Sequence, residues 1–219
     1  MRVAVIGGSG RFGGALAWAL AQRGNEVVIG SRTAERAVDA AGLLGSEVSA
    51  GAVEGARNRD AVRHADIVLL CVPARGQRRV LTEIADTVAG RCVVDTCVCE
   101  HPRTLGVWAP PREGSAAARV RRLLPPRVAV AATLHAVPVP ALRQPQRHDC
   151  GDVLVAADGP GSRDAAREVL RSLGLRCLEA GDLAAAPALE HFALLLHRLS
   201  AHHGREVGGA RFPALGGAR

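Results

Sequence analysis

A glycine-rich turn between a short strand and a helix constrains the fold of this chain more than any other feature. Arg2–Ile6 is an apolar, β-branched run typical of a buried strand, and the turn after it reads Gly8-Ser9-Gly10-Arg11-Phe12-Gly13. Apolar residues at helical spacing follow over residues 12–23, and Gly24 is placed to end that helix. A G-x-G-x-x-G pattern in this setting predicts a βαβ unit that binds a dinucleotide.

Strand and helix patterns continue to alternate along the rest of the chain. Strands are predicted at residues 26–30, 46–53 (weakly), 67–72, 92–96, 128–133, 153–156 and 176–179, and helices at 33–44, 60–64, 76–89, 116–124, 162–173 and 184–201. Residues 100–114 carry prolines and glycines and are expected to be irregular. This order predicts an α/β protein with a Rossmann-type, doubly wound, mainly parallel sheet. We expect one domain over residues 1–219, with a nucleotide-binding core over about 1–125 and a smaller α/β extension over about 126–219.

The turn itself has the chemistry of a phosphate site. Gly8 permits a tight turn, Gly10 lets the backbone approach a pyrophosphate, and Gly13 allows the helix to pack closely on the strand. The helix N-terminus offers free N–H groups and partial positive charge. The cofactor-binding prediction therefore covers Gly8, Ser9, Gly10, Arg11, Phe12 and Gly13. The alternative interpretation is a glycine-rich turn that binds nothing.

The end of the second strand favours NADP(H) over NAD(H). A site for NAD places Asp or Glu here to accept the ribose 2′-OH, but the chain reads Ile29-Gly30-Ser31-Arg32. Ser31 is able to hydrogen-bond a 2′-phosphate and Arg32 to pair with it, with Arg36 one turn further as support. In the other interpretation Ser31 only caps the following helix and Arg32 is solvated.

Segments at the carboxyl ends of the predicted strands should line the reactive end of the cleft. These segments include Val72-Pro73, Asp95-Thr96-Cys97 and Leu134-His135-Ala136. His135 ends a core strand, so it is our candidate to orient the nicotinamide carboxamide or supply a proton, and Val72, Pro73 and Ala136 are predicted cofactor contacts. A hydrogen-bonded structural histidine is the alternative.

Two further groups of residues have open roles. Cys97-Val98-Cys99-Glu100-His101 suggests a metal or a redox pair, but the spacing is not that of a zinc finger, and we assign no metal. Arg75, Arg78 and Arg79 either meet an anionic ligand or form a solvated start to a helix.

Composition narrows the function classes. The formal charge is +7, every Lys/Arg position is arginine, and tyrosine is absent. Scattered arginines without tyrosines for base stacking argue against nucleic acid as a partner. The missing Lys and Tyr exclude a Tyr-x-x-x-Lys reductase and a Schiff-base lysine. No run of about 20 apolar residues is present, and six cysteines are too few for a disulfide framework, so we expect a soluble cytoplasmic protein with reduced thiols.

Longer segments resemble the NADPH-dependent coenzyme F420 reductases (F420:NADP oxidoreductases). The similarity begins in the first two strands and resumes in the 65–69 region and at Val72-Pro73. The more specific segments are Leu134-His135-Ala136-Val137-Pro138, Leu178-Glu179-Ala180-Gly181-Asp182-Leu183 and the tail at Ala210-Arg211-Phe212. The chain differs from the family at residues 97–102, where thiols and polar groups replace an apolar, proline-containing loop.

The resemblance implies a homodimer, paired through the C-terminal helix, in which NADP(H) and the deazaflavin coenzyme F420 meet face to face. Hydride would pass between nicotinamide C4 and deazaflavin C5, which needs alignment and exclusion of water but no protein nucleophile. The residues leave two alternatives open. One is an NADPH-dependent reductase of a small organic substrate, such as an imine or an unsaturated biosynthetic intermediate, with His135 or His101 as proton donor. The other is a non-catalytic NADP-binding redox sensor.

Overall fold

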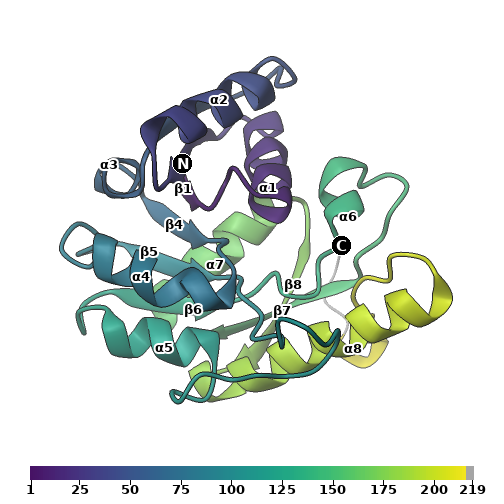
Figure 1. The fold of residues 1–219 in the computed structure, drawn as a ribbon. Coiled ribbons are helices and arrows are strands. Elements are labelled where there is room, and N and C mark those ends of the chain that lie inside the picture. Colours follow the sequence, from purple (N-terminus) through teal and green to yellow (C-terminus); the bar gives the residue numbers. More distant parts are fainter. Residues whose placement is uncertain (216–219) are drawn as a thin grey trace.

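The computed structural model describes residues 1–215, which form one eight-stranded sheet with helices on both faces (Figure 1). The sheet order is β3-β2-β1-β4-β5-β6-β7-β8. All neighbouring strands are parallel except β6 and β7, which run antiparallel. The strands are β1 (Arg2–Ile6), β2 (Glu26–Ser31), β3 (Ala52–Arg57), β4 (Ile67–Leu70), β5 (Cys92–Asp95), β6 (Ala129–Ala132), β7 (Asp152–Ala157) and β8 (Arg176–Gly181). The predicted doubly wound, mainly parallel α/β fold is confirmed.

The two faces of the sheet carry different helices because side chains alternate along each strand. Val3 and Val5 point toward a core formed with α1 (Arg11–Gln22), α2 (Ala34–Gly45), α6 (Val139–Arg143) and α7 (Pro160–Ser172). Ala4 and Ile6 point the other way, toward α3 (Asn58–Arg63), α4 (Ala74–Ile84) and α5 (Ala116–Leu123). None of the helices within residues 1–215 is long and apolar enough to cross a membrane.

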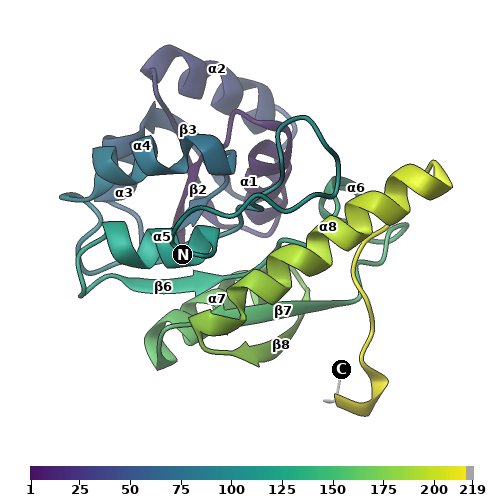
Figure 2. The same ribbon diagram turned by 60° about the horizontal axis from the view of Figure 1, so that its bottom comes forward.

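The last long helix, α8 (Ala186–His203), follows the short 3₁₀ turn η1 (Leu183–Ala185) and lies across one face (Figure 2). It begins against β6 and β7, where Ala186 and Leu189 pack with Ala132 and Ala156. After α8 the chain turns back and pairs with the sheet through an antiparallel bridge between Asp152 and Ala210, and η2 (Pro213–Leu215) closes the described chain.

Two local predictions were wrong. The third strand was expected over residues 46–53, but β3 occupies Ala52–Arg57, because it is an edge strand whose half-exposed residues give little apolar alternation. Helix α6 was not predicted; Pro138 precedes it and Pro140 lies in its first turn. Proline is compatible with the first turn of a helix, where its missing N–H has no partner to lose.

Candidate active site

The glycine-rich turn is present as predicted, but Gly7 rather than Gly8 makes the tight turn. Gly7, which the motif leaves out, is the residue in the left-handed region, at φ +88°. Its carbonyl accepts the Gly10 N–H at 2.9 Å, closing the turn. Gly8, to which the sequence assigned the tight turn, instead packs on β2: an added Cβ there would lie 3.0 Å from the Ile29 side chain. At Gly13 an added Cβ would lie 2.4 Å from the Gly7 carbonyl oxygen, so the predicted close packing of α1 on the turn is present.

A pocket of about 330 Å³ opens beside this turn at the end of β2. We call it the arginine pocket, because its lining includes Ser31, Arg32, Arg36, Arg75 and Arg79. Ser31 is buried, and it does not cap α2, since the residue at the N-cap is Thr33. The structure therefore removes the capping interpretation of Ser31 and groups it with the predicted Arg32 and Arg36.

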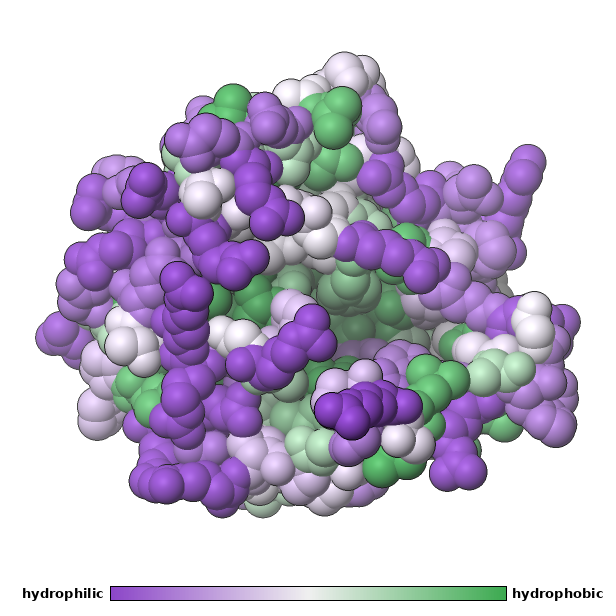
Figure 3. Space-filling view, in the orientation of Figure 1, coloured by the Kyte–Doolittle hydropathy of each residue, from purple (hydrophilic) through white to green (hydrophobic). Residues whose placement is uncertain are grey.

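A second pocket, of about 440 Å³, lies on the other side of the turn; we call it the central pocket. Figure 3 shows apolar side chains in a hollow surrounded by hydrophilic ones. Among the predicted residues, the lining includes Gly10, Arg11, Phe12, Gly13, Val72, Pro73, Cys97, His135 and Ala136. Gly10, Cys71, Val72 and Pro73 line both pockets, so the two adjoin between the segment after β4 and the glycine-rich turn at residues 7–13, which we call the phosphate turn. Predicted residues from five separate parts of the sequence thus line two adjoining pockets.

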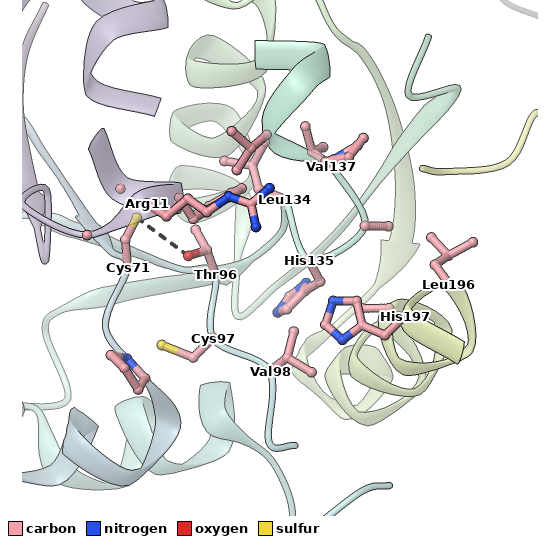
Figure 4. Close-up of a pocket in the computed structure, with 18 of the residues that line it drawn as sticks. Arg11, Cys71, Thr96, Cys97, Val98, Leu134, His135, Val137, Leu196 and His197 are labelled. Atoms are coloured by element: carbon pink, nitrogen blue, oxygen red, sulfur yellow. Dashed lines mark hydrogen bonds between the residues drawn. The ribbon is translucent and has the colours of Figure 1, made fainter. Parts of the chain in front are cut away.

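His135 lies in the wall of the central pocket on an unusual backbone (Figure 4). Leu134, directly before it, has φ +66°, the only positive φ outside glycine within residues 1–215. Such a conformation is costly for a leucine and is commonly retained at functional sites. The Nε2 atom of His135 is enclosed and has no hydrogen-bond partner in the described chain. Burial lowers the pKa of His135 to about 4, so its imidazole is neutral near pH 7.

Side chains from the C-terminal half of α8 and the residues after it complete the central pocket, and they were not predicted from the sequence. His197 lines the pocket with its Nδ1 atom 3.3 Å from Glu100 Oε1, and it lies close to His135 in Figure 4. Glu206, beyond the helix, lines the rim and faces Arg11 at 3.7 Å. Arg11 and Glu206 are 195 residues apart in the sequence (206 − 11), which explains why no local pattern predicted their contact.

Glu190 holds the irregular segment 97–116 against α8. Its carboxylate is fully buried and accepts N–H groups from Cys99 at 2.9 Å and Ala116 at 2.8 Å, with Trp108 Nε1 at 3.5 Å. Ala116 is the first residue of α5, so the negative charge also lies at the positive end of that helix. This carboxylate fixes the loop that carries Cys97 and Val98 into the pocket wall.

Both thiols of the cysteine-rich loop, Cys97 and Cys99, are buried. The Cys97 thiol donates to the Val72 carbonyl at 3.0 Å, and burial raises the pKa of both Cys97 and Cys99. All six cysteines are free, and residues 1–215 contain no group of three or more His, Cys, Asp or Glu placed to hold a metal ion. His101 is exposed and absent from the pocket lining, so the structure removes it as a candidate proton donor.

A buried network of polar side chains lies next to Thr96 and Cys97, two residues that line the central pocket. Gln77 on α4 donates to Asp95 Oδ1 at 2.8 Å, and Arg119 on α5 donates to Gln77 Oε1 at 3.3 Å. The second oxygen of Asp95 has no partner within the described residues, and burial raises the pKa of Asp95 to about 7. The carboxyl group of Asp95 therefore changes its protonation state near neutral pH although it is buried.

Several known proteins are similar to this chain in sequence or in fold. A sequence model of the family described as "NADP oxidoreductase coenzyme F420-dependent" matches residues 2–98. The F420-dependent NADP reductase of Methanothermobacter thermautotrophicus is 36% identical over 228 residues, covering 98% of this chain and 96% of that protein. The reductase of the same name from Methanothermobacter marburgensis is 34% identical, covering 91% and 92%. A crystal structure of a putative F420-dependent NADP reductase from Arthrobacter sp. FB24 superposes with a TM-score of 0.83 at 23% identity, covering 99% of each chain.

Proposed function

The chain belongs to the family of F420-dependent NADP reductases, and we propose that its two adjoining pockets hold NADP(H) and coenzyme F420 for hydride transfer between them. The observation that carries this proposal is the continuity of the arginine pocket, the phosphate turn and the central pocket. A dinucleotide has the same order of parts: a 2′-phosphorylated adenosine, a pyrophosphate and a nicotinamide. The activity is that of an NADP-dependent oxidoreductase.

The phosphate turn and the arginine pocket supply the binding groups for NADP(H). Ser31, Arg32 and Arg36 are placed to hydrogen-bond and neutralise the 2′-phosphate. The N-terminus of α1, from Arg11 onward, presents free N–H groups to the pyrophosphate, and the Arg11 side chain lines the central pocket beside them. Arg11 then exchanges its exposed contact with Glu206 for a phosphate.

The central pocket supplies alignment and exclusion of water. NADP(H) and F420 provide the hydride donor and acceptor carbons, nicotinamide C4 and deazaflavin C5, so the protein needs to stack two rings and keep them dry. Val72, Pro73, Val98 and Ala136 offer apolar contacts for those rings. His135 acts here as a neutral group: its enclosed Nε2 atom has a free hydrogen-bonding position, which suits the orientation of the carboxamide.

Assembly and location are part of the same proposal. Leu195 on α8 is 52% exposed and Leu105, in the adjoining loop, is 56% exposed. Apolar side chains of this size at the surface support pairing of two copies through the α8 face, giving a homodimer. Six free cysteines and the nucleotide cofactors support a place in the reducing cytoplasm.

The direct test mixes purified protein with NADPH and oxidised F420 and follows the visible absorbance of the deazaflavin. We expect bleaching that depends on both reactants. Tight NADPH binding without bleaching at micromolar protein would overturn the assignment of F420. Exchange of Arg32 for alanine should weaken NADPH far more than NADH, and equal weakening of both would contradict the 2′-phosphate role.

A further inference from the structure

Four arginines line the arginine pocket, and none of them has an acidic partner among residues 1–215. Arg32 lies in the turn between β2 and α2, Arg36 in the first turn of α2, and Arg75 and Arg79 on α4. We propose that Arg75 and Arg79 form a second side of the 2′-phosphate site, so that the phosphate of NADP(H) is held between α2 and α4. This inference rests on the proposed function and assigns specificity to residues outside the glycine-rich motif.

Arg75 and Arg79 face the arginine pocket, whereas the residues between them on α4 make other contacts. Arg75 and Arg79 are four residues apart and therefore lie on one face of the helix. Gln77 and Val80 point inward to the core, although Val80 also reaches the pocket edge. Arg78 lies between them in sequence but forms an ion pair with Glu113 at 2.7 Å, away from the pocket. Only two of the three arginines in this helix are thus available to a ligand.

The four pocket arginines lack carboxylate partners, unlike several arginines on the neighbouring helix α3 and on α4 itself. Nearby arginines find carboxylates: Arg59 pairs with Asp86 and Arg63 with Asp60. Within residues 1–215, none of the four pocket arginines forms an ion pair, and Glu35, which lies beside Arg36 in sequence, forms none either. Like charges gathered in one pocket repel each other until an anion enters.

A phosphate monoester matches this arrangement better than a carboxylate or a single phosphodiester. It carries a charge of about −1.5 to −2 at neutral pH and three acceptor oxygens. Guanidinium groups bind such oxygens in planar, paired hydrogen bonds. Groups approaching from α2 and α4 reach different oxygens, so both helices contribute to binding.

Stacking on the adenine ring is the competing role for Arg75 and Arg79, and it has a different signature. A guanidinium that stacks on adenine binds NADPH and NADH equally, because both carry the same ring. A guanidinium that pairs with the 2′-phosphate strengthens NADPH alone. The ratio of the two affinities therefore separates the roles.

The test measures dissociation constants of NADPH and NADH for the full chain and for Arg75→Gln and Arg79→Gln, with Arg78→Gln as the matched control. Each pocket variant should weaken NADPH by roughly tenfold and NADH by less than about twofold. Arg78→Gln should leave both constants unchanged. Because the arginines are exposed, the preference for NADPH should also shrink between about 50 mM and about 500 mM salt.

The outcomes distinguish this inference from the proposed function. Unchanged NADPH binding in both pocket variants, or equal weakening of NADPH and NADH, would overturn the inference. If the unmodified protein itself shows no preference for NADPH, the assignment of NADP(H) fails instead. Binding of 2′-AMP against 5′-AMP repeats the comparison without the nicotinamide half, so defects in the central pocket do not affect it.

Discussion

Exchange of Glu190 for glutamine tests how the pocket wall is held. Its carboxylate accepts two short backbone hydrogen bonds, from Cys99 and Ala116, and is fully buried. Glutamine keeps one acceptor oxygen but turns an NH₂ group toward the other N–H, so one charged hydrogen bond is lost and a buried donor is left without a partner. Hydrogen bonds to charged groups contribute about 1.5–3 kcal/mol and an unsatisfied buried group costs about 1–3 kcal/mol. We expect the free energy of unfolding to fall by about 3 kcal/mol.

Urea unfolding followed by circular dichroism measures this loss, and a thermal scan should show a fall in Tm of about 6–12 °C for a chain of this length. Glu168→Gln on α7 is the matched control, because Glu168 is exposed, and its unfolding free energy should change by less than about 0.5 kcal/mol. A Glu190→Gln protein as stable as the control would refute the reasoning that this carboxylate fixes the loop to α8.

Three further changes probe the fold and the site. Burial gives Asp95 a pKa of about 7 in place of its ordinary 3.8, so the folded protein holds this proton more tightly than the unfolded chain, and stability should fall as pH rises from about 4 to about 7, by up to about 4 kcal/mol. Asp95→Asn should flatten that part of the curve in urea unfolding at several pH values; an unchanged slope would contradict the assignment. Gly13→Ala forces a methyl group against the Gly7 carbonyl and should cost about 1–3 kcal/mol by thermal unfolding, whereas Gly42→Ala, in open space on α2, should add about 0.5–1 kcal/mol. The His135 imidazole, with its pKa lowered to about 4 by burial, should remain neutral down to about pH 5 in an NMR titration, and stability should fall as pH drops from about 6.5 to about 4; a midpoint above 6 would show that the ring is not enclosed.

Sequence patterns predicted the part of the candidate site that is built from residues close together in the chain. The turn from Gly8 to Gly13, Ser31 and Arg32 follow strands within one βαβ unit, so motif and position together indicated a phosphate site. His135 was predicted as a site residue because it comes at the end of a strongly apolar run, and it lies in the wall of the central pocket. Residues His197 and Glu206 carry no comparable signal, since they reach the pocket only after the later strands and α8 have packed.

The sequence could not assign a role to a residue whose type is suited to two different roles. Ser31 was compatible with a helix cap or a phosphate contact, and only the observed N-cap at Thr33 separated them. The sequence did not distinguish Arg75, Arg78 and Arg79. In the structure Arg78 forms an ion pair with Glu113, which is distant in the chain, and does not line the pocket. Such distinctions depend on tertiary partners that a strand or helix pattern does not contain.

The two pockets are completed at different stages of protein synthesis, because their lining residues end at different points in the sequence. The arginine pocket is built entirely from residues 7–80, so its parts leave the ribosome early. The central pocket needs α8 and the residues up to Val207, which the β6–β7 reversal and the β7–β8 pair direct back to the phosphate turn. The nascent chain therefore contains every residue of the arginine pocket more than a hundred residues before the last residue of the central pocket is made.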